Sequence, residues 1–225
     1  MKTNIVKILA FAAAAATALS VNAANNAPVA DPVGSVSVGY ANENFYRGAD
    51  IGDETLKVGA ELHGTVAGVS TFGSVVTNQS IDGGADQYFI TAGIASKLFD
   101  LDATTGYLHY ENVPGEATGE LFARLTASKF LNLSGIVYYE LDNELWTTEL
   151  GVSHSIDLDF ATVTGSASIG NTEVSSSNDR TYHSVGVDAR RELTADVDLV
   201  IGVEYVDADD SEDDTVFFTG VQVNF

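Results

Sequence analysis

The four histidines, His63, His109, His154 and His183, offer the widest choice of catalytic chemistry in this chain. A hydrolase acting on lipids would need a serine, a histidine and a polar orienting group close together. Ser153 and Ser155 flank His154, but neighbouring side chains on a strand point to opposite faces. The chain also has no Gly-x-Ser-x-Gly nucleophile motif. We therefore expect no catalytic residues, and a lipid-modifying enzyme ranks third among the functions considered below.

Metal, cofactor and nucleic-acid sites are not expected either. No His, Asp or Glu cluster has metal-ligand spacing, and no glycine-rich loop leads into a helix as nucleotide binding would require. The chain has no cysteine, which excludes disulfides and zinc–thiolate sites. Its formal net charge of −22 excludes a nucleic-acid partner, because phosphate binding needs a basic surface. The acidic residues within 207–214 are typical of a solvated loop, with divalent-cation binding as the alternative.

The end of the chain, residues 214–225, has the pattern of a strand with one apolar face. Side chains alternate between the two faces of a strand, and here one face carries Phe217, Thr219, Val221, Val223 and the terminal Phe225. A strand that closes a barrel in a lipid bilayer needs such an outer face. The pattern resembles the C-terminal signal strand of bacterial outer-membrane barrels. We expect Phe217, Val221, Val223 and Phe225 to be the signal for the barrel-assembly machinery; the alternative is the last strand of a secreted β-sandwich.

The start of the chain predicts export. Lys2 and Lys7 precede an apolar, Ala-rich run at residues 8–19, and a small-residue cleavage site ends at Ala23. This is the pattern of a secretory signal peptide at residues 1–23, and the run is too short for a comfortable membrane-spanning helix. We interpret residues 24–33 as a flexible lead-in and residues 34–225 as one domain. An exported chain with a barrel-closing strand is expected in the outer membrane of a Gram-negative cell, in contact with its lipid.

From residue 34 onward the chain alternates in stretches of about ten residues, with no convincing helical period. The expected strands are 35–42, 55–65, 69–78, 87–98, 101–110, 120–129, 132–141, 144–155, 158–169, 180–191, 196–206 and 214–225. Short and long connections alternate between them, as they do in outer-membrane barrels. Aromatic residues lie mostly near the strand ends, as interfacial girdles would. The pattern predicts an all-β fold, an antiparallel up-and-down transmembrane barrel of about twelve strands, with ten or fourteen as alternatives.

The faces opposite the apolar stripes carry charge and are expected to line the lumen. These lumen candidates are Lys57, Glu61, Arg124, Glu140, Glu149, Asp188, Arg190 and Glu204. A twelve-stranded barrel lies between one filled by side chains and one with an open channel. We expect a narrow pore for ions or small polar solutes, weakly favouring cations because an acidic mouth raises their local concentration. The alternative is a non-conducting barrel whose charges pair across the lumen and whose acidic loops bind cations or a partner.

Two stretches resemble the TorF family of outer-membrane porins. Residues 40–48 end in Tyr46-Arg47-Gly48 and are similar to the family's "dYryRG" element, although Asn44-Phe45 stands where the family usually has a Ser-Asp pair. Residues 106–115 and then Glu120-Leu121 are similar to its "GYxxY…PG…E" stretch. The resemblance implies an outer-membrane barrel and supplies no catalytic residues. For Arg47 we expect a loop anchor stacked on an aromatic ring rather than a ligand contact.

Overall fold

The structure is a computed structural model that describes residues 33–115, 117–129, 131–175, 178–209 and 213–225. Twelve strands form one closed barrel: β1 (Val33–Ala41), β4 (Thr55–Val66), β5 (Val69–Ser80), β6 (Asp86–Leu98), β7 (Leu101–Val113), β8 (Ala117–Ser128), β9 (Asn132–Glu140), β10 (Trp146–Leu158), β11 (Ala161–Ser175), β12 (Asn178–Thr194), β13 (Val197–Ala208) and β14 (Asp214–Asn224). Every pair of neighbours is antiparallel. The predicted fold class and strand number are therefore confirmed.

The signal peptide expected at residues 1–23 and nearly all of the expected lead-in lie outside the described residues. Val33, which we placed in the lead-in, already belongs to β1. No helix in the described part of the chain is long and apolar enough to cross a membrane.

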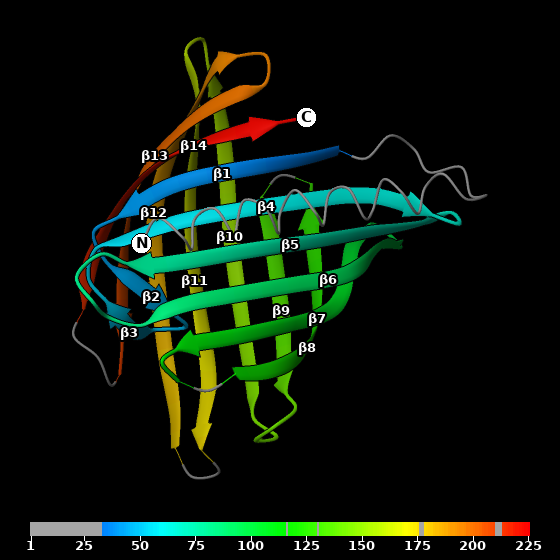
Figure 1. Cartoon of the computed structure of the whole chain (residues 1–225). Coiled ribbons are helices and arrows are strands. Elements are labelled where there is room, and N and C mark those ends of the chain that lie inside the picture. Colours follow the sequence, from blue (N-terminus) through cyan, green and yellow to red (C-terminus); the bar gives the residue numbers. More distant parts are fainter. Residues whose placement is uncertain (1–32, 116, 130, 176–177, 210–212) are drawn as a thin grey trace.

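The C-terminal strand closes the barrel, as its pattern predicts. β14 pairs with β13 on one side and with β1 on the other, where Val38 faces Val221 across the pair. The last bonds join Gly34 and Phe225, whose backbone N–H and C=O groups exchange two hydrogen bonds of 2.9 Å. Figure 1 shows β1 and β14 side by side at this seam. Because both edges of the sheet are paired, the structure contradicts the sandwich alternative.

The apolar stripes cover the outside of the barrel. Residues that face each other across antiparallel strands share a face, so the register assigns whole rows to the inner or the outer side. Leu150, for example, pairs with Ile169 and both are more than half exposed, at 66% and 54%. Phe217 and Phe225 are likewise 59% exposed. Side chains this large and this exposed need an apolar surrounding, which a bilayer supplies.

Several turns differ from those we expected. β10 continues through Asp157 to Leu158, so the turn expected at Asp157 lies at residues 159–160 instead. Asp157 points inward and accepts a 2.7 Å hydrogen bond from the hydroxyl of Thr162 on β11. A polar residue facing the lumen was therefore mistaken for a turn signal. The turn expected at residues 193–195 is shifted in the same direction, to residues 195–196.

Aromatic residues form belts at both ends of the outer face. Tyr139 and Trp146 contact each other near the long-connection end, with ring centroids 4.7 Å apart. At the opposite end, Phe99 and Phe160 occupy turns and are 92% and 66% exposed. These two residues lie in turns, beyond the strand ends at which we expected the girdles. Together the belts mark the two edges of an apolar band, as in membrane barrels.

A substitution at Phe225 tests the assembly signal. Phe225→Ala keeps the backbone pairing with Gly34 and removes an exposed ring, so we expect refolding and thermal stability in detergent to change little. The amount of folded barrel in the outer membrane of living cells should fall several-fold. Leu150→Ala is the matched control because it also removes an exposed outer side chain. Equal loss of folded barrel in both variants would contradict a signalling role for Phe225.

Candidate functional site

The connection between β1 and β4, which we expected to be a polar loop, contains a small hairpin. β2 (Asn44–Tyr46) pairs with β3 (Ala49–Gly52), and Tyr46 faces Ala49 across a two-residue turn. Both turn residues have positive φ, 53° at Arg47 and 74° at Gly48. Two positive φ values in a two-residue loop are typical of a type I′ turn, whose twist matches that of the strands it joins. Figure 1 shows this hairpin at the end of the barrel where β1 ends and β4 begins.

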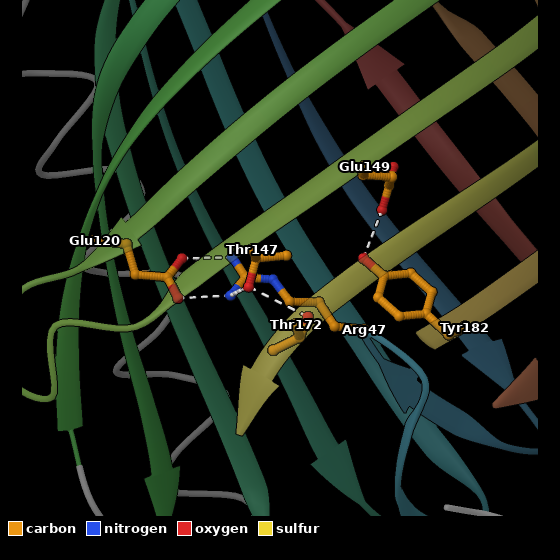
Figure 2. Close-up of polar contacts among 6 residues, drawn as sticks. All are labelled: Arg47, Glu120, Thr147, Glu149, Thr172 and Tyr182. Carbon is orange, nitrogen blue, oxygen red and sulfur yellow. Dashed lines mark hydrogen bonds and ion pairs between the residues drawn. The ribbon is translucent and has the colours of Figure 1, made fainter. Parts of the chain in front are cut away.

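Arg47, at the tip of the hairpin, is fixed inside the barrel. Its two terminal nitrogens donate hydrogen bonds of 2.6 and 2.5 Å to the carboxylate of Glu120 on β8. A further bond of 3.4 Å reaches the hydroxyl of Thr147 on β10 (Figure 2). The guanidinium also lies 4.1 Å from the centre of the Tyr138 ring. The expected loop anchor with a stacked arginine is thus confirmed by these contacts.

The Arg47–Glu120 pair is buried as well as bidentate. The side chains are only 12% and 3% exposed. Burial alone would lower the pKa of Arg47, but the hydrogen bonds and charge of Glu120, with Tyr46, outweigh it and raise that pKa above its ordinary value. The guanidinium therefore stays charged. Two parallel charge-assisted bonds fix both the position and the orientation of the hairpin tip.

The remaining hairpin residues contact the wall on other sides. Tyr46 stacks on Tyr110 of β7, with ring centroids 4.9 Å apart, and its burial raises the pKa of the phenol, which stays protonated. Asn44 donates a 2.7 Å hydrogen bond to Gln87 of β6. Phe45 packs against a buried cluster that includes Val206 of β13. The hairpin therefore crosses the lumen and narrows it.

Gly48 allows the hairpin tip to approach the wall at β12 and β13. A Cβ added at this position would lie 2.5 Å from the Cβ of Tyr182 on β12 and 2.9 Å from that of Ala208 on β13. Real side-chain carbons do not come this close, and the positive φ also disfavours other residues. Tyr182 is itself held by a 2.9 Å hydrogen bond to Glu149 of β10 (Figure 2). The Arg47-Gly48 sequence therefore suits both the turn and its surroundings.

The two stretches that resemble TorF porins contact each other in the structure. The first supplies Tyr46 and Arg47, and the second supplies their partners Tyr110 and Glu120. Glu120 was quoted only as part of that stretch and was not among our lumen candidates. A bidentate arginine partner far along the sequence has no periodic signal, so only this motif pointed to it.

The register places all of the lumen candidates on the inner face. Lys57 faces Asn78, Glu61 faces Ser74, Arg124 faces Ile136, Glu140 faces Glu120, Glu149 faces Gly170, Asp188 faces Thr164, Arg190 faces Thr162, and Glu204 faces Gly186. Arg190 is bound to the wall through Gln222 at 3.1 Å and Asp198 at 3.8 Å. That these residues line a conducting path stays a prediction.

Two histidines lie beside carboxylates in the described part of the chain: His63 lies 2.7 Å from Glu61, and His183 lies 3.3 Å from Asp207. Ser153 and Ser155 lie on the inner face, while His154 lies in an outer row with Gly165. No three His, Asp or Glu side chains of the described residues are grouped as a metal ion would require. Asp210 and Glu212 of the acidic loop lie outside the described residues.

No family model matches this chain, and no curated protein matches it in sequence. Its fold resembles that of solved porins. The KdgM porin is 13% identical, with a TM-score of 0.57 over 85% of this chain and 99% of KdgM. The NanC porin is 12% identical, with a TM-score of 0.58 over 84% and 98%. The COG4313 outer membrane channel from Pseudomonas putida F1 is 11% identical, with a TM-score of 0.54 over 89% and 97%.

A second structure shows KdgM in complex with disordered oligogalacturonate, at 13% identity and a TM-score of 0.56 over 85% of this chain and 99% of KdgM. At these identities the similarity shows the fold alone. The chain is thus a small twelve-stranded barrel resembling outer-membrane porins, and the closer resemblance to the TorF family stays a prediction.

Proposed function

We propose that this protein is a channel of the Gram-negative outer membrane through which ions or small polar solutes diffuse. The observation that carries the proposal is the combination of a closed barrel, an apolar outer face and a charged inner face. A bilayer accepts only a structure whose backbone groups are all paired, which closure provides. Charged inner side chains keep water and ions in the lumen.

The channel favours cations weakly. Of the lumen candidates, five are acids and three are bases, and the Arg47–Glu120 pair adds no net charge. Excess carboxylates raise the local concentration of cations along the path. KdgM binds an oligogalacturonate, which is an anionic sugar chain, and the acidic lumen described here does not favour that class of substrate.

Neutralising two inner carboxylates tests this selectivity. Glu140 accepts a hydrogen bond from Asn143 and Glu149 accepts one from Tyr182, and a glutamine oxygen can still accept both. In the Glu140→Gln/Glu149→Gln variant we expect the cation-to-anion permeability ratio to fall by about twofold. Reversal potentials across a planar bilayer with a salt gradient measure it. Glu111→Gln, on the outer face in the row of Tyr88, is the matched control, and an unchanged ratio in the double variant would reject the cation preference.

A second candidate function is a non-conducting surface barrel whose acidic loops bind cations or a partner. The buried hairpin favours it, because the tip is fixed on one side of the barrel at Glu120 and contacts the other side at Tyr182. Single-channel recording of the refolded protein decides between the two. Discrete cation-biased steps support the channel, whereas a folded but silent barrel supports the alternative. A lipid-modifying enzyme remains the third candidate.

A further inference from the structure

One part of the lumen wall carries several apolar and aromatic side chains around an open cavity of about 230 Å³. Its lining consists of five apolar or aromatic residues, Phe72, Leu108, Phe122, Ile136 and Tyr138, and of the polar residues Thr91, Thr104 and Arg124. These side chains come from the inner faces of the five consecutive strands β5 to β9. The rings pack at tilted angles to one another, with the centroid of Phe122 lying 6.3 Å from that of Phe72 and 6.0 Å from that of Tyr138.

Contact with the hairpin explains only part of this wall. Tyr46 packs on Tyr110 and on Phe89, which lies against the same apolar cluster, whereas Phe45 packs on the cluster beside β13 and β14. No hairpin residue lines the cavity, although Arg47 covers the Tyr138 ring beside it. Leu108, Phe122 and Ile136 pack together and are nearly buried, so the cavity offers a solute a preformed surface with apolar and polar parts.

Arg124 gives the cavity a positive charge. It is exposed to the lumen, and no residue in the described part of the chain forms a hydrogen bond or ion pair with its guanidinium. In this it differs from Arg47 and Arg190, which both have carboxylate partners. An arginine without such a partner at the edge of an apolar cavity suits a carboxylate, which it can bind through two parallel hydrogen bonds.

The size and charge of the cavity define the ligand. A cavity of about 150 Å³ lined by Leu, Ile and Phe binds benzene, so 230 Å³ holds one ring and a carboxylate. A second negative charge would be disfavoured, because Glu149 lies in the same row of the wall as Arg124 and Ile136. We propose that the cavity is a binding site for small monocarboxylates with a flat apolar body, of the class of benzoate.

The site deepens the channel function and rests on it, because the cavity lies along the path that the solute would take. The acidic lumen sets the preference among simple ions, whereas the cavity adds apolar contact that simple ions cannot make. Such a ligand is held by its ring and oriented by its carboxylate. It should therefore slow the ionic current while it is bound.

Titration calorimetry of the refolded barrel in detergent tests the site with benzoate as the ligand. We expect benzoate to bind at least about tenfold more tightly than acetate, which lacks the ring, and than phthalate, which carries a second charge. In Arg124→Gln the affinity for benzoate should fall by about 10-fold or more, because a charge-assisted bond is lost. Arg190→Gln, which removes a lumen guanidinium outside the cavity, should bind benzoate as the unmodified protein does.

Equal affinity for acetate and benzoate, or equal affinity in Arg124→Gln, would overturn the proposal. A second variant, Ile136→Asn, places a polar group in the apolar wall, and unchanged benzoate binding there would also overturn it. Thermal unfolding of each variant confirms that the barrel is folded. Planar-bilayer recordings separate this proposal from the channel function: benzoate binding to a silent barrel rejects the channel alone, and conduction without benzoate binding rejects the site alone.

Discussion

Removing the β2–β3 hairpin will raise the single-channel conductance by about threefold or more, because a twelve-stranded barrel without an internal obstruction leaves room for an aqueous path. The hairpin is the segment that crosses this lumen, from Glu120 on one side to Tyr182 on the other. Its removal exposes the wall residues that it now covers, among them Tyr110, Tyr138 and Val206. The expected channel is wider and less selective.

The design of this deletion follows from the strand register. Ala41, the last residue of β1, faces Thr55, the first residue of β4, so a tight turn can join the two strands. Replacing residues 43–53 with an Asn-Gly turn leaves every barrel pairing in place. Removing residues 82–83 from the β5–β6 connection is the matched control, because nothing lies within 4 Å of a Cβ added at Gly83.

Conductance in symmetric salt is the measurement, and heat-modified mobility of the barrel in detergent verifies folding. If the deletion and the control conduct equally, the hairpin does not limit the pore. A folded deletion variant that stays silent would instead favour the non-conducting barrel.

The outer face and closure of the barrel could be predicted from the sequence because they depend on a strict period of two. An apolar residue must stand at every second position to meet lipid, as in Val221, Val223 and Phe225. The same alternation predicts that the charged residues between the apolar ones face the lumen. Strand ends were less predictable, since a polar residue such as Asp157 suits a turn and a lumen equally well.

The hairpin was not predicted because its contacts join residues far apart in the chain. Arg47 meets Glu120 and Gly48 meets Tyr182, and neither pair belongs to a periodic pattern. Arg-Gly between two short strands is a two-residue hairpin signal only when both residues can adopt positive φ, and arginine seldom does. The cavity is hidden for a similar reason. Phe72, Phe122 and Ile136 come from three strands, and each looks by itself like an ordinary strand residue.

Substituting only one member of the Arg47–Glu120 pair will release the hairpin from the barrel wall. Removing one partner of a buried ion pair leaves the other charge uncompensated, at a cost of about 3–5 kcal/mol, and both side chains here are nearly inaccessible. The barrel pairings do not depend on this contact, so the hairpin should open while the barrel stays folded. In Glu120→Leu we expect faster proteolysis after Arg47 and a noisier, larger current, and the same current change in Arg47→Met.

The double variant Arg47→Met/Glu120→Leu distinguishes two causes of hairpin opening: a buried charge left without its partner, and the loss of the contacts themselves. Replacing both members of a buried ion pair with apolar residues of similar volume is often neutral or stabilising, and the surrounding rings of Tyr46 and Tyr138 can pack against a methionine. We therefore expect the double variant to recover slow proteolysis and a quiet, small current, although each single variant loses both. Trypsin no longer cleaves at a methionine, so proteinase K is the appropriate protease for all three. A double variant as open as the singles would mean that the bidentate geometry itself, and not the balance of buried charge, keeps the hairpin in the lumen.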